Sequence, residues 1–526
     1  MKFKKIVCAA AAFAFVLPFA ACADKDEQPT ALDDNYRNWY EIFVRSFYDS
    51  GDDGIGDIKG VTQKLDYVKE MGFNGIWFMP ICQSNTYHGY DVVDYYTVES
   101  DYGTNDDFKE LVREAHSRGI NVIVDMVFNH SSISHPWYQK ALQALKNNDT
   151  TSENAKYIDY YNFSDTKVTD KYAPVGNGLD LFYECPFDTA MPDLNLDNTA
   201  VREEIADIME FWLTDMDVDG FRLDACTSYY TGNVQKNVEF LSFVNTTAKS
   251  VKSDAYIVGE VWEGTDAQIR AYYESGIDSC FLFTASAGAA GISTIKSTLS
   301  SIQSKPGEYY TQLLLDYQRI YDKGTQAPFL CNHDTSRAAN MFVGDTQTKM
   351  GAGLLALMNG NTFVYYGDEI GMVCKNADSD PTKRIPILWS EDSMAAGQVF
   401  MPPQPGVSIG SDAYRYPSVA EQQEDEFSIL AYYKKVMNMR HRHPEIARGT
   451  VEALTAPNES IAAFKKTYEG KSVTVLVNLS DVDTYTVNLA DYGDVKVKDL
   501  IDATTEKSTS SKKSVTMKPY SIAILR

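Results

Sequence analysis

The stretch Gly220-Phe221-Arg222-Leu223-Asp224, entered from Met216-Asp217-Val218-Asp219, decides the fold. It is typical of a buried strand that ends in an acid, with Asp224 where the strand runs out into a loop. Side chains two residues apart on a strand point to the same face. Arg222 therefore faces the same space as Asp224 and keeps that carboxylate ionised. The other interpretation of this pair is a structural ion pair inside a barrel.

Strand-like and helix-like segments alternate on both sides of this stretch. Such alternation indicates parallel β/α units. The strand count approaches eight, so we predict an α/β fold built as a (β/α)8 barrel. Besides the central stretch, the expected strands cover 39–47, 74–79, 121–128, 255–261, 278–283, 328–331 and 362–366. The expected helices cover 60–71, 106–118, 200–213, 237–251 and 349–358.

Other parts of the chain interrupt or follow this alternation. Residues 131–195 are rich in aromatic residues and contain Gly and Pro, which predicts an inserted lobe, domain B, after the third strand. From residue 444 the sequence changes to short alternating strands, which indicate an antiparallel β-sandwich domain over 444–526. The barrel is then expected over 36–130 and 196–443.

The N-terminus has the pattern of a targeting segment. Three lysines precede an apolar run that is too short to span a bilayer, and Phe19-Ala20-Ala21-Cys22 is similar to a bacterial lipobox. We predict a signal peptide over 1–21, a lipid anchor at Cys22 and a tether over 22–35. The protein would then be exported and held at the cell surface; plain secretion with cleavage nearby is the alternative.

Composition narrows the class of partner. The formal net charge of −25 argues against nucleic acid and anionic membrane surfaces, so the lipid anchor is the only membrane contact expected. A neutral substrate is compatible with this charge. The 34 tyrosines and 6 tryptophans offer flat faces with polar rims that suit sugar rings, although ordinary core and surface roles explain most of them.

The candidate chemistry lies at strand C-termini, where barrel active sites are built. Four stretches carry it: 125–130, 220–224, 259–262 and 329–334. They place Asp224, Glu260 and Asp334 around one mouth, together with histidines and an arginine. Glycoside hydrolysis needs one ionised and one protonated carboxyl group, and the environment sets that difference. The sequence contains no basic phosphate cradle, Ser-His-Asp order or Cys/His metal cluster that would favour another chemistry.

On these four stretches the chain resembles the α-amylase family, glycoside hydrolase family 13, from about residue 36 to the end. A fifth motif, Met191-Pro192-Asp193-Leu194-Asn195, is similar to that of the intermediate group between oligo-1,6-glucosidases and neopullulanases. That group contains exported and lipid-anchored bacterial α-amylases. The resemblance implies a retaining hydrolase of α-1,4-glucosidic bonds in starch, maltodextrin and related α-glucans.

Two other functions remain open at this point. One is a relative with another bond or reaction preference, such as hydrolysis of pullulan or α-1,6 bonds, or transglycosylation. The other is a non-catalytic starch-binding protein on the same fold, which the three intact carboxylates argue against. Monomer is assumed for the oligomeric state.

The resemblance also assigns roles by matching position. It makes Asp224 the nucleophile, Glu260 the general acid/base and Asp334 the group that holds the hydroxyls of the distorted sugar. The residues expected to bind substrate or support the site are Arg222, His130, His333, Tyr90, His88 and Asp125. A lone histidine is usually a satisfied core residue, but His130 and His333 lie inside full motifs.

The chain departs from the family pattern on the leaving-group side. Thr227-Ser228 stands where endo-acting members often carry Lys-His. Ala225 resembles α-1,4-specific members, whereas α-1,6-specific relatives tend to have Val. We therefore expect an α-1,4 preference with loose binding of the leaving group.

An acidic loop follows the first expected strand. Over 49–57, carboxylates alternate with glycines, and such spacing can wrap a hard, oxygen-preferring cation. The loop resembles a calcium loop of the same subgroup, which implies structural Ca²⁺ bound by Asp49, Asp53, Asp57 and the Ile55 carbonyl. Gly51 replaces a usual side-chain ligand. A solvated acidic turn is the alternative.

Overall fold

The computed structural model describes residues 36–526, except 177, 263–264, 286–292, 393–394, 408 and 410–413. Residues 1–35, with the predicted signal peptide, Cys22 and the tether, lie outside the described residues, so those predictions remain predictions. In the described part, no helix has the length and apolar character needed to cross a membrane.

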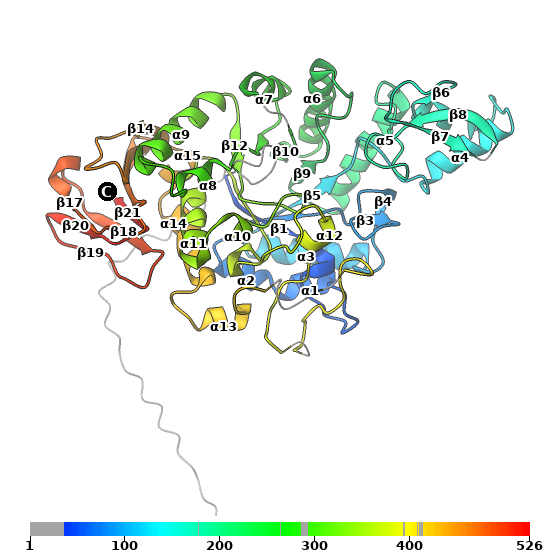
Figure 1. Cartoon of the computed structure of the whole chain (residues 1–526). Helices are drawn as coiled ribbons and strands as arrows, with labels where there is room; N and C mark the ends of the chain where they lie inside the picture. Colours follow the sequence, from blue (N-terminus) through cyan, green and yellow to red (C-terminus); the bar gives the residue numbers. More distant parts are fainter. Residues whose placement is uncertain are drawn as a thin grey trace, which may run out of the picture. The chain divides into compact units, whose positions relative to one another are not determined.

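Eight parallel strands form the central sheet, and they alternate with helices along the chain (Figure 1). The strands are β1 (Asn38–Ile42), β2 (Gly75–Phe78), β5 (Asn121–Met126), β9 (Gly220–Leu223), β10 (Tyr256–Gly259), β11 (Ser279–Leu282), β12 (Thr325–Pro328) and β13 (Thr362–Tyr365). Their order is β12-β11-β10-β9-β5-β2-β1-β13. A parallel bridge from Phe329 to Phe363 joins the two ends of this order and closes the sheet. The predicted (β/α)8 barrel is confirmed.

Several helices that follow these strands combine an apolar stripe with a polar N-cap side chain. In α3, buried Phe108, Leu111, Val112 and Ala115 recur at helical spacing, and Thr104 forms a capping box with Asp107. The helices of the barrel and its loops are α1 (Ile58–Gln63), α2 (Leu65–Glu70), α3 (Asn105–Ser117), α5 (Thr199–Glu210), α6 (Val234–Val251), α7 (Asp266–Tyr273), α8 (Thr294–Thr298), α9 (Pro306–Ile320), α10 (Ala338–Met341), α11 (Gly344–Ala356), α12 (Asp380–Lys383), α13 (Val419–Gln423), α14 (Ile429–Arg442) and α15 (Glu445–Arg448).

Several expected boundaries were wrong, among them the start of the helix expected over 349–358, which begins at Gly344. The strand expected over 39–47 ends at Ile42, because the chain turns into a short 3₁₀ helix at Val44–Ser46, in which Val44 and Ser46 are buried. The strand expected over 328–331 ends at Pro328, because Asn332 begins a turn in which its amide donates to Thr335. The helix expected over 60–71 is two helices, since Lys64 leaves helical geometry between them.

A separate apolar cluster fills the inside of the barrel. Trp39, Trp77, Tyr256, Phe281 and Phe363 are among its buried residues. The Trp39 ring stacks on Tyr256 at 5.2 Å and on Phe363 at 5.7 Å between centroids. This packed layer lies beneath the polar residues of the strand ends, so the barrel is a core with one reactive end rather than a pore.

The strand that carries Arg222 requires glycine at its start. Gly220 has φ +147°, and a Cβ there would lie 1.9 Å from the carbonyl oxygen of Tyr256. Only glycine therefore permits β9 to pair with β10 along Gly220–Leu223. The register places Arg222 beside Asp125 of β5.

Residues after β5 form a lobe of their own, labelled together in Figure 1. It contains α4 (Pro136–Lys146), a 3₁₀ segment at Ala155–Tyr160, and the antiparallel strands β6 (Phe163–Ser164), β7 (Tyr172–Gly176) and β8 (Leu179–Glu184). A bridge between His130 and Asp193 ties the two ends of this lobe together. A short hairpin, β3 (Cys82–Ser84) with β4 (Val92–Val98), precedes α3.

The C-terminal part consists of two antiparallel sheets. One has the order β14-β15-β16-β21-β18 and the other β17-β20-β19. The strands are β14 (Thr450–Ala453), β15 (Ile461–Tyr468), β16 (Lys471–Asn478), β17 (Tyr485–Asn488), β18 (Val497–Asp502), β19 (Thr509–Ser510), β20 (Ser514–Met517) and β21 (Ser521–Leu525). Buried Lys466 donates hydrogen bonds to the carbonyls of Leu357 at 2.7 Å and Ile446 at 2.6 Å, which joins this part to the barrel helices.

Candidate active site

The site is built around the buried guanidinium of Arg222. Its Nη1 lies 2.8 Å from Asp125 Oδ1 and 2.7 Å from Asp224 Oδ1, and its Nη2 lies 3.1 Å from Glu260 Oε1. The carboxylates come from the ends of β5, β9 and β10. One cation therefore faces three acids, which is enough to hold them together but not enough to neutralise all three.

This charge imbalance separates the acids by protonation state. Burial raises the pKa of Glu260 to about 7. The Arg222 charge lowers this pKa, whereas the nearby Asp224 and Asp334 charges raise it further. Burial likewise raises the pKa of Asp125 to about 7. Asp224 and Glu260 are each less than one-tenth exposed, at 9% and 8%, and face the open end of the barrel. Glu260 is thus a carboxyl group that can carry a proton near neutral pH.

The turn after Asp224 fixes the position of Glu260. The backbone N–H of Ala225 donates to Glu260 Oε2 at 2.8 Å. Ala225 has φ +51°, in the left-handed region that a non-glycine residue seldom adopts. This strained turn aims the amide at the carboxyl group of the neighbouring strand.

Asp334 has a different environment from Glu260. His333 Nε2 lies 2.9 Å from Asp334 Oδ2, and Arg384 Nη2 lies 2.8 Å from Asp334 Oδ1. Burial opposes the charged form, but His333, Arg384 and Arg222 hold the pKa of Asp334 well below its usual range. Asp334 is therefore ionised, and its side chain is 28% exposed toward the mouth.

His333 bridges two acids and a tyrosine. Its Nδ1 lies 2.6 Å from Glu41 Oε1, and Tyr90 Oη lies 2.5 Å from its Nε2. Burial works against a charged ring, but Asp334 and Glu41 together raise the pKa of His333 to about 9. The Tyr90 hydroxyl also donates to Asp125 Oδ2 at 3.1 Å, and its ring stacks on His333. These contacts connect the Asp334 side of the site with the Arg222 side.

The two remaining histidines expected in the site are buried His130 and partly buried His88. His130 packs against the exposed ring of Phe187 at 5.4 Å between centroids, and burial lowers its pKa. His88 accepts the backbone N–H of Tyr90 at 3.1 Å, and burial, with Arg384 nearby, lowers its pKa to about 4. Both rings are neutral at physiological pH and can exchange hydrogen bonds with a neutral ligand. All nine residues expected in the catalytic and substrate groups thus lie in one region.

Three further residues belong to this region and were missed. Glu41 and Arg384 contact the His333–Asp334 pair as described, and the Arg222 guanidinium lies 5.3 Å from the Trp77 ring centroid. Glu41 is a single acid in the apolar stretch 38–44, a signal that a buried acid needs a partner. Arg384 comes from the loop after β13, and nothing in its local sequence indicates that it reaches Asp334.

A cavity of about 570 Å³ adjoins the site on the side of Asp334 and Arg384. Tyr87 and His88 line its inner end, and Arg384 Nη1 contacts the Tyr87 hydroxyl at 3.4 Å. Its outer walls include Arg45, Asn85 and Gln404. These side chains offer both donors and acceptors, so the cavity can receive polar ligand groups beyond the catalytic residues.

The loop expected to bind calcium is ordered by its own hydrogen bonds. Buried Asp49 accepts the backbone N–H groups of Gly51 at 2.9 Å and Gly54 at 2.6 Å. Asp57 caps α1 by accepting from Gly60 N, and Asp53 accepts from the N–H of Ile55, at 2.9 Å. Across the described residues, no group of three or more His, Cys, Asp and Glu side chains is arranged to hold a metal ion.

The six cysteines from Cys82 onward are buried free thiols.

The comparisons with known proteins agree with this geometry. Residues 41–449 match the family model for the α-amylase catalytic domain. The chain is 34% identical to "Alpha-amylase 3" of Dictyoglomus thermophilum, with 93% of each chain covered. It is 28% identical to "Oligo-1,6-glucosidase" of Parageobacillus thermoglucosidasius, with 93% of this chain and 97% of the relative covered.

Solved structures give the same result. "Eubacterium rectale Amy13B" has a TM-score of 0.87 and 38% identity, with 94% of this chain and 96% of that chain covered. The α-amylase from H. orenii has a TM-score of 0.78 and 31% identity, with 93% and 99% covered. The chain belongs to the α-amylase family, glycoside hydrolase family 13.

Proposed function

We propose that this protein is a retaining hydrolase that cleaves α-1,4-glucosidic bonds in starch, maltodextrins and related α-glucans. The observation that carries the proposal is the arrangement of Asp224, Glu260 and Asp334 at one end of the barrel. Arg222 contacts the first two, and burial raises the pKa of Glu260 to about 7, so that this group can carry a proton. A proton donor thus stands beside a carboxylate held by a guanidinium, and these are the two carboxyl groups that glycoside cleavage requires.

The first step uses Asp224 and Glu260 together. Arg222 holds Asp224 Oδ1, so Oδ2 attacks the anomeric carbon while the bond to the leaving oxygen breaks. Glu260 gives its proton to that oxygen, and the sugar becomes an ester of Asp224. Glu260, now a base, then takes a proton from the water that cleaves the ester.

The closeness of the two carboxyl groups favours retention. Both contact terminal nitrogens of one guanidinium, so they are near neighbours. Retaining enzymes have carboxyl groups about 5–5.5 Å apart, whereas inverting enzymes leave about 6.5–9.5 Å for a water. Ionised Asp334 and neutral His130 supply acceptors and donors for the hydroxyls of the reacting sugar.

Transfer to a sugar in place of water is the second candidate. Relatives of the chain include "4-alpha-glucanotransferase" of Thermotoga neapolitana, at 30% identity. The exposed ring of Phe187 beside His130 favours a sugar acceptor at the rim, because an aromatic face packs against a pyranose face. Products longer than the substrate would identify transfer.

Bond preference tests the proposed substrate directly. We expect kcat/KM on maltotriose to exceed that on isomaltotriose, since the Ala225 methyl leaves room beside Asp224 for an α-1,4-linked neighbour. Ala225→Val should shift the ratio toward isomaltotriose by about tenfold, because one or two methylenes in a pocket change specificity by about 1–3 kcal/mol. Val is strained at φ +51°, so the ratio within each protein is compared rather than the absolute rates. A wild type that prefers isomaltotriose would contradict the α-1,4 assignment.

The pKa of Glu260 predicts an alkaline limit to activity. The acid must carry its proton, so kcat/KM on maltotriose should fall about tenfold per pH unit above about 7. Fluoride leaves without a proton, so kcat/KM on α-glucosyl fluoride should not fall near pH 7. It should fall only near pH 9, where His333 titrates. Parallel pH profiles on the two substrates measure this difference. The same fall in kcat/KM near pH 7 on both substrates would mean that Glu260 is not the acid.

Calcium in the loop over 49–57 remains a prediction. The alternating carboxylates support it, and Gly51, whose added Cβ would lie 3.8 Å from Asp49 Oδ1, provides no ligand. An ion bound only by the folded chain stabilises it by mass action, so excess chelator should lower the melting temperature of the wild type. Asp53→Asn should lower it without chelator and remove the chelator effect. An unchanged melting curve with no calcium in elemental analysis would leave this loop as a solvated turn.

A further inference from the structure

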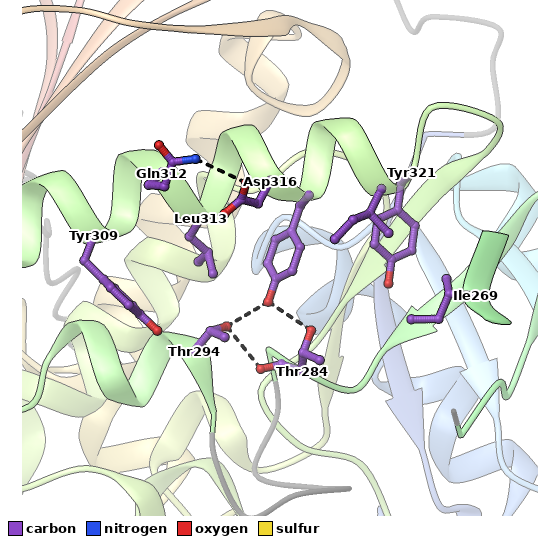
Figure 2. Close-up of a pocket in the computed structure, with 10 residues that line it drawn as sticks. Ile269, Thr284, Thr294, Tyr309, Gln312, Leu313, Asp316 and Tyr321 are labelled. Atoms are coloured by element: carbon purple, nitrogen blue, oxygen red, sulfur yellow. Dashed lines mark hydrogen bonds between the residues drawn. The ribbon is translucent and has the colours of Figure 1, made fainter. Parts of the chain in front are cut away.

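A second cavity lies apart from the residues of the active site. It has a volume of about 310 Å³ and is bounded by α9, the start of α8, α7 and the segment after β11 (Figure 2). Pockets that bind small molecules begin at about this size. None of the active-site residues described above is among those that line it.

The lining combines flat apolar faces with neutral polar groups. Tyr309 and Leu313 project from α9 toward Thr294 in Figure 2, whereas Asp316 lies along the helix beside Gln312. Of the residues that line the cavity, Asp316 is the one that carries charge, and it is an acid. Phosphate and other anions are therefore disfavoured, whereas a neutral ligand rich in hydroxyls meets both apolar faces and acceptors.

The polar groups of the cavity are already oriented. The Tyr317 hydroxyl lies 2.9 Å from both Thr284 Oγ1 and Thr294 Oγ1. On α9, the Gln312 amide donates to Asp316 Oδ1 at 3.2 Å. Because these contacts fix the side chains before binding, a ligand loses less free energy in ordering them. Vicinal hydroxyls of a sugar can exchange hydrogen bonds with such threonine, amide and carboxylate groups.

The cavity adjoins the chain segments of the catalytic end. Thr284 follows Phe283 directly, and the Phe283 ring packs against Trp262 in a tilted arrangement, 4.3 Å between centroids. Trp262 is 39% exposed and lies two residues after Glu260. In the barrel, β11 pairs with β10, which ends at Gly259 beside the acid. One wall of the cavity therefore continues directly from a segment that contacts Trp262, close in sequence to Glu260.

We propose that this cavity is a second, non-catalytic site for a neutral α-glucan segment, which holds one part of a polymeric substrate while another part occupies the active site. The identity of the ligand as α-glucan rests on the proposed function. Tethering one segment raises the effective concentration of the next to the mM range. The gain applies to polymers and not to oligosaccharides too short to reach both sites.

The double variant Tyr309→Ala, Gln312→Ala tests the proposal. Both side chains are partly or fully exposed, so the fold is retained. We expect KM for soluble starch to rise about two- to fivefold while kcat/KM for maltotriose is unchanged, the factor that a weak mM site gives. Tyr485→Ala, a partly buried tyrosine of the C-terminal sheets outside the cavity, is the matched control and should change neither value.

Direct binding separates this proposal from the proposed function. Maltotriose is titrated calorimetrically into the Asp224→Asn variant, with and without the two cavity substitutions. We expect two binding sites per chain in the first protein and one in the second. One site in both, together with an unchanged KM for starch, would overturn the proposal. If the wild type fails to hydrolyse maltotriose but the two-site result holds, the cavity is a sugar site and the proposed function alone is wrong.

Discussion

Asp224→Asn is expected to lower kcat on maltotriose by roughly 10⁴-fold or more, and Glu260→Gln by about 10²–10⁴-fold, while the melting curve of each variant stays that of the wild type. Loss of a nucleophile removes the covalent route, and loss of a positioned acid costs about 10²–10⁴ on its own. Both substitutions keep the size and most hydrogen bonds of the side chain. Asp254→Asn and Glu274→Gln, exposed acids outside the site, are the matched controls and should retain full activity.

The two variants should differ on an activated substrate. Fluoride leaves without a proton, so Glu260→Gln should still cleave α-glucosyl fluoride in the first step, whereas Asp224→Asn should not. Normal kcat on maltotriose in either variant would contradict the two-carboxylate mechanism. Equal loss on the fluoride in both variants would contradict the assignment of Glu260 as the acid.

Arg222→Met should be the most damaging single change to both stability and activity. The substitution leaves Asp125, Asp224 and Glu260 together without the cation that now contacts all three. Removing one partner of a buried ion pair costs about 3–5 kcal/mol of unfolding free energy, because the remaining charges stay buried. Arg113→Met removes an exposed arginine of α3 that pairs with Glu110 and should change stability by no more than about 1 kcal/mol.

The pH dependence of Arg222→Met separates charge from packing. Burial already raises the pKa values of Asp125 and Glu260, and loss of the guanidinium should raise them further above their unfolded values. Stability is then largest below the unfolded pKa of about 4 and is lost as pH rises through the folded pKa values. Urea unfolding should therefore show a larger deficit against wild type at pH 8 than at pH 5. An equal deficit at both pH values would mean that lost packing, not charge, destabilises the variant.

The central part of the site could be predicted because the local sequence of single strands indicates where its acids lie. An acid after an apolar strand, as at Asp224 and Glu260, lies at the carboxyl end of that strand, and a closed parallel barrel brings such ends together. Asp125 lies inside β5, and the resemblance singled it out as a supporting residue. The sixth strand, expected over 278–283, is β11 at Ser279–Leu282.

The remainder could not be predicted because it depends on segments distant in sequence. Arg384 contacts Asp334 from a loop after β13, and Glu41 of β1 contacts His333, which follows β12. The predicted ends of strands were wrong where the chain stays buried past the last hydrogen bond of the sheet, as at Val44–Ser46. A buried loop has the same apolar pattern as a buried strand. Ala225 shows a third limit, because its left-handed backbone has no signal in an alanine.

The anomeric form of the first product tests the central claim most directly. Proton NMR of maltotriose during the first minutes of hydrolysis separates the α- and β-anomeric protons before mutarotation mixes them. Double displacement through an Asp224 ester inverts the anomeric carbon twice, so the account predicts that the α-anomer of the product appears first. The β-anomer as the first product would mean a single inversion by water, and it would contradict Asp224 as the nucleophile.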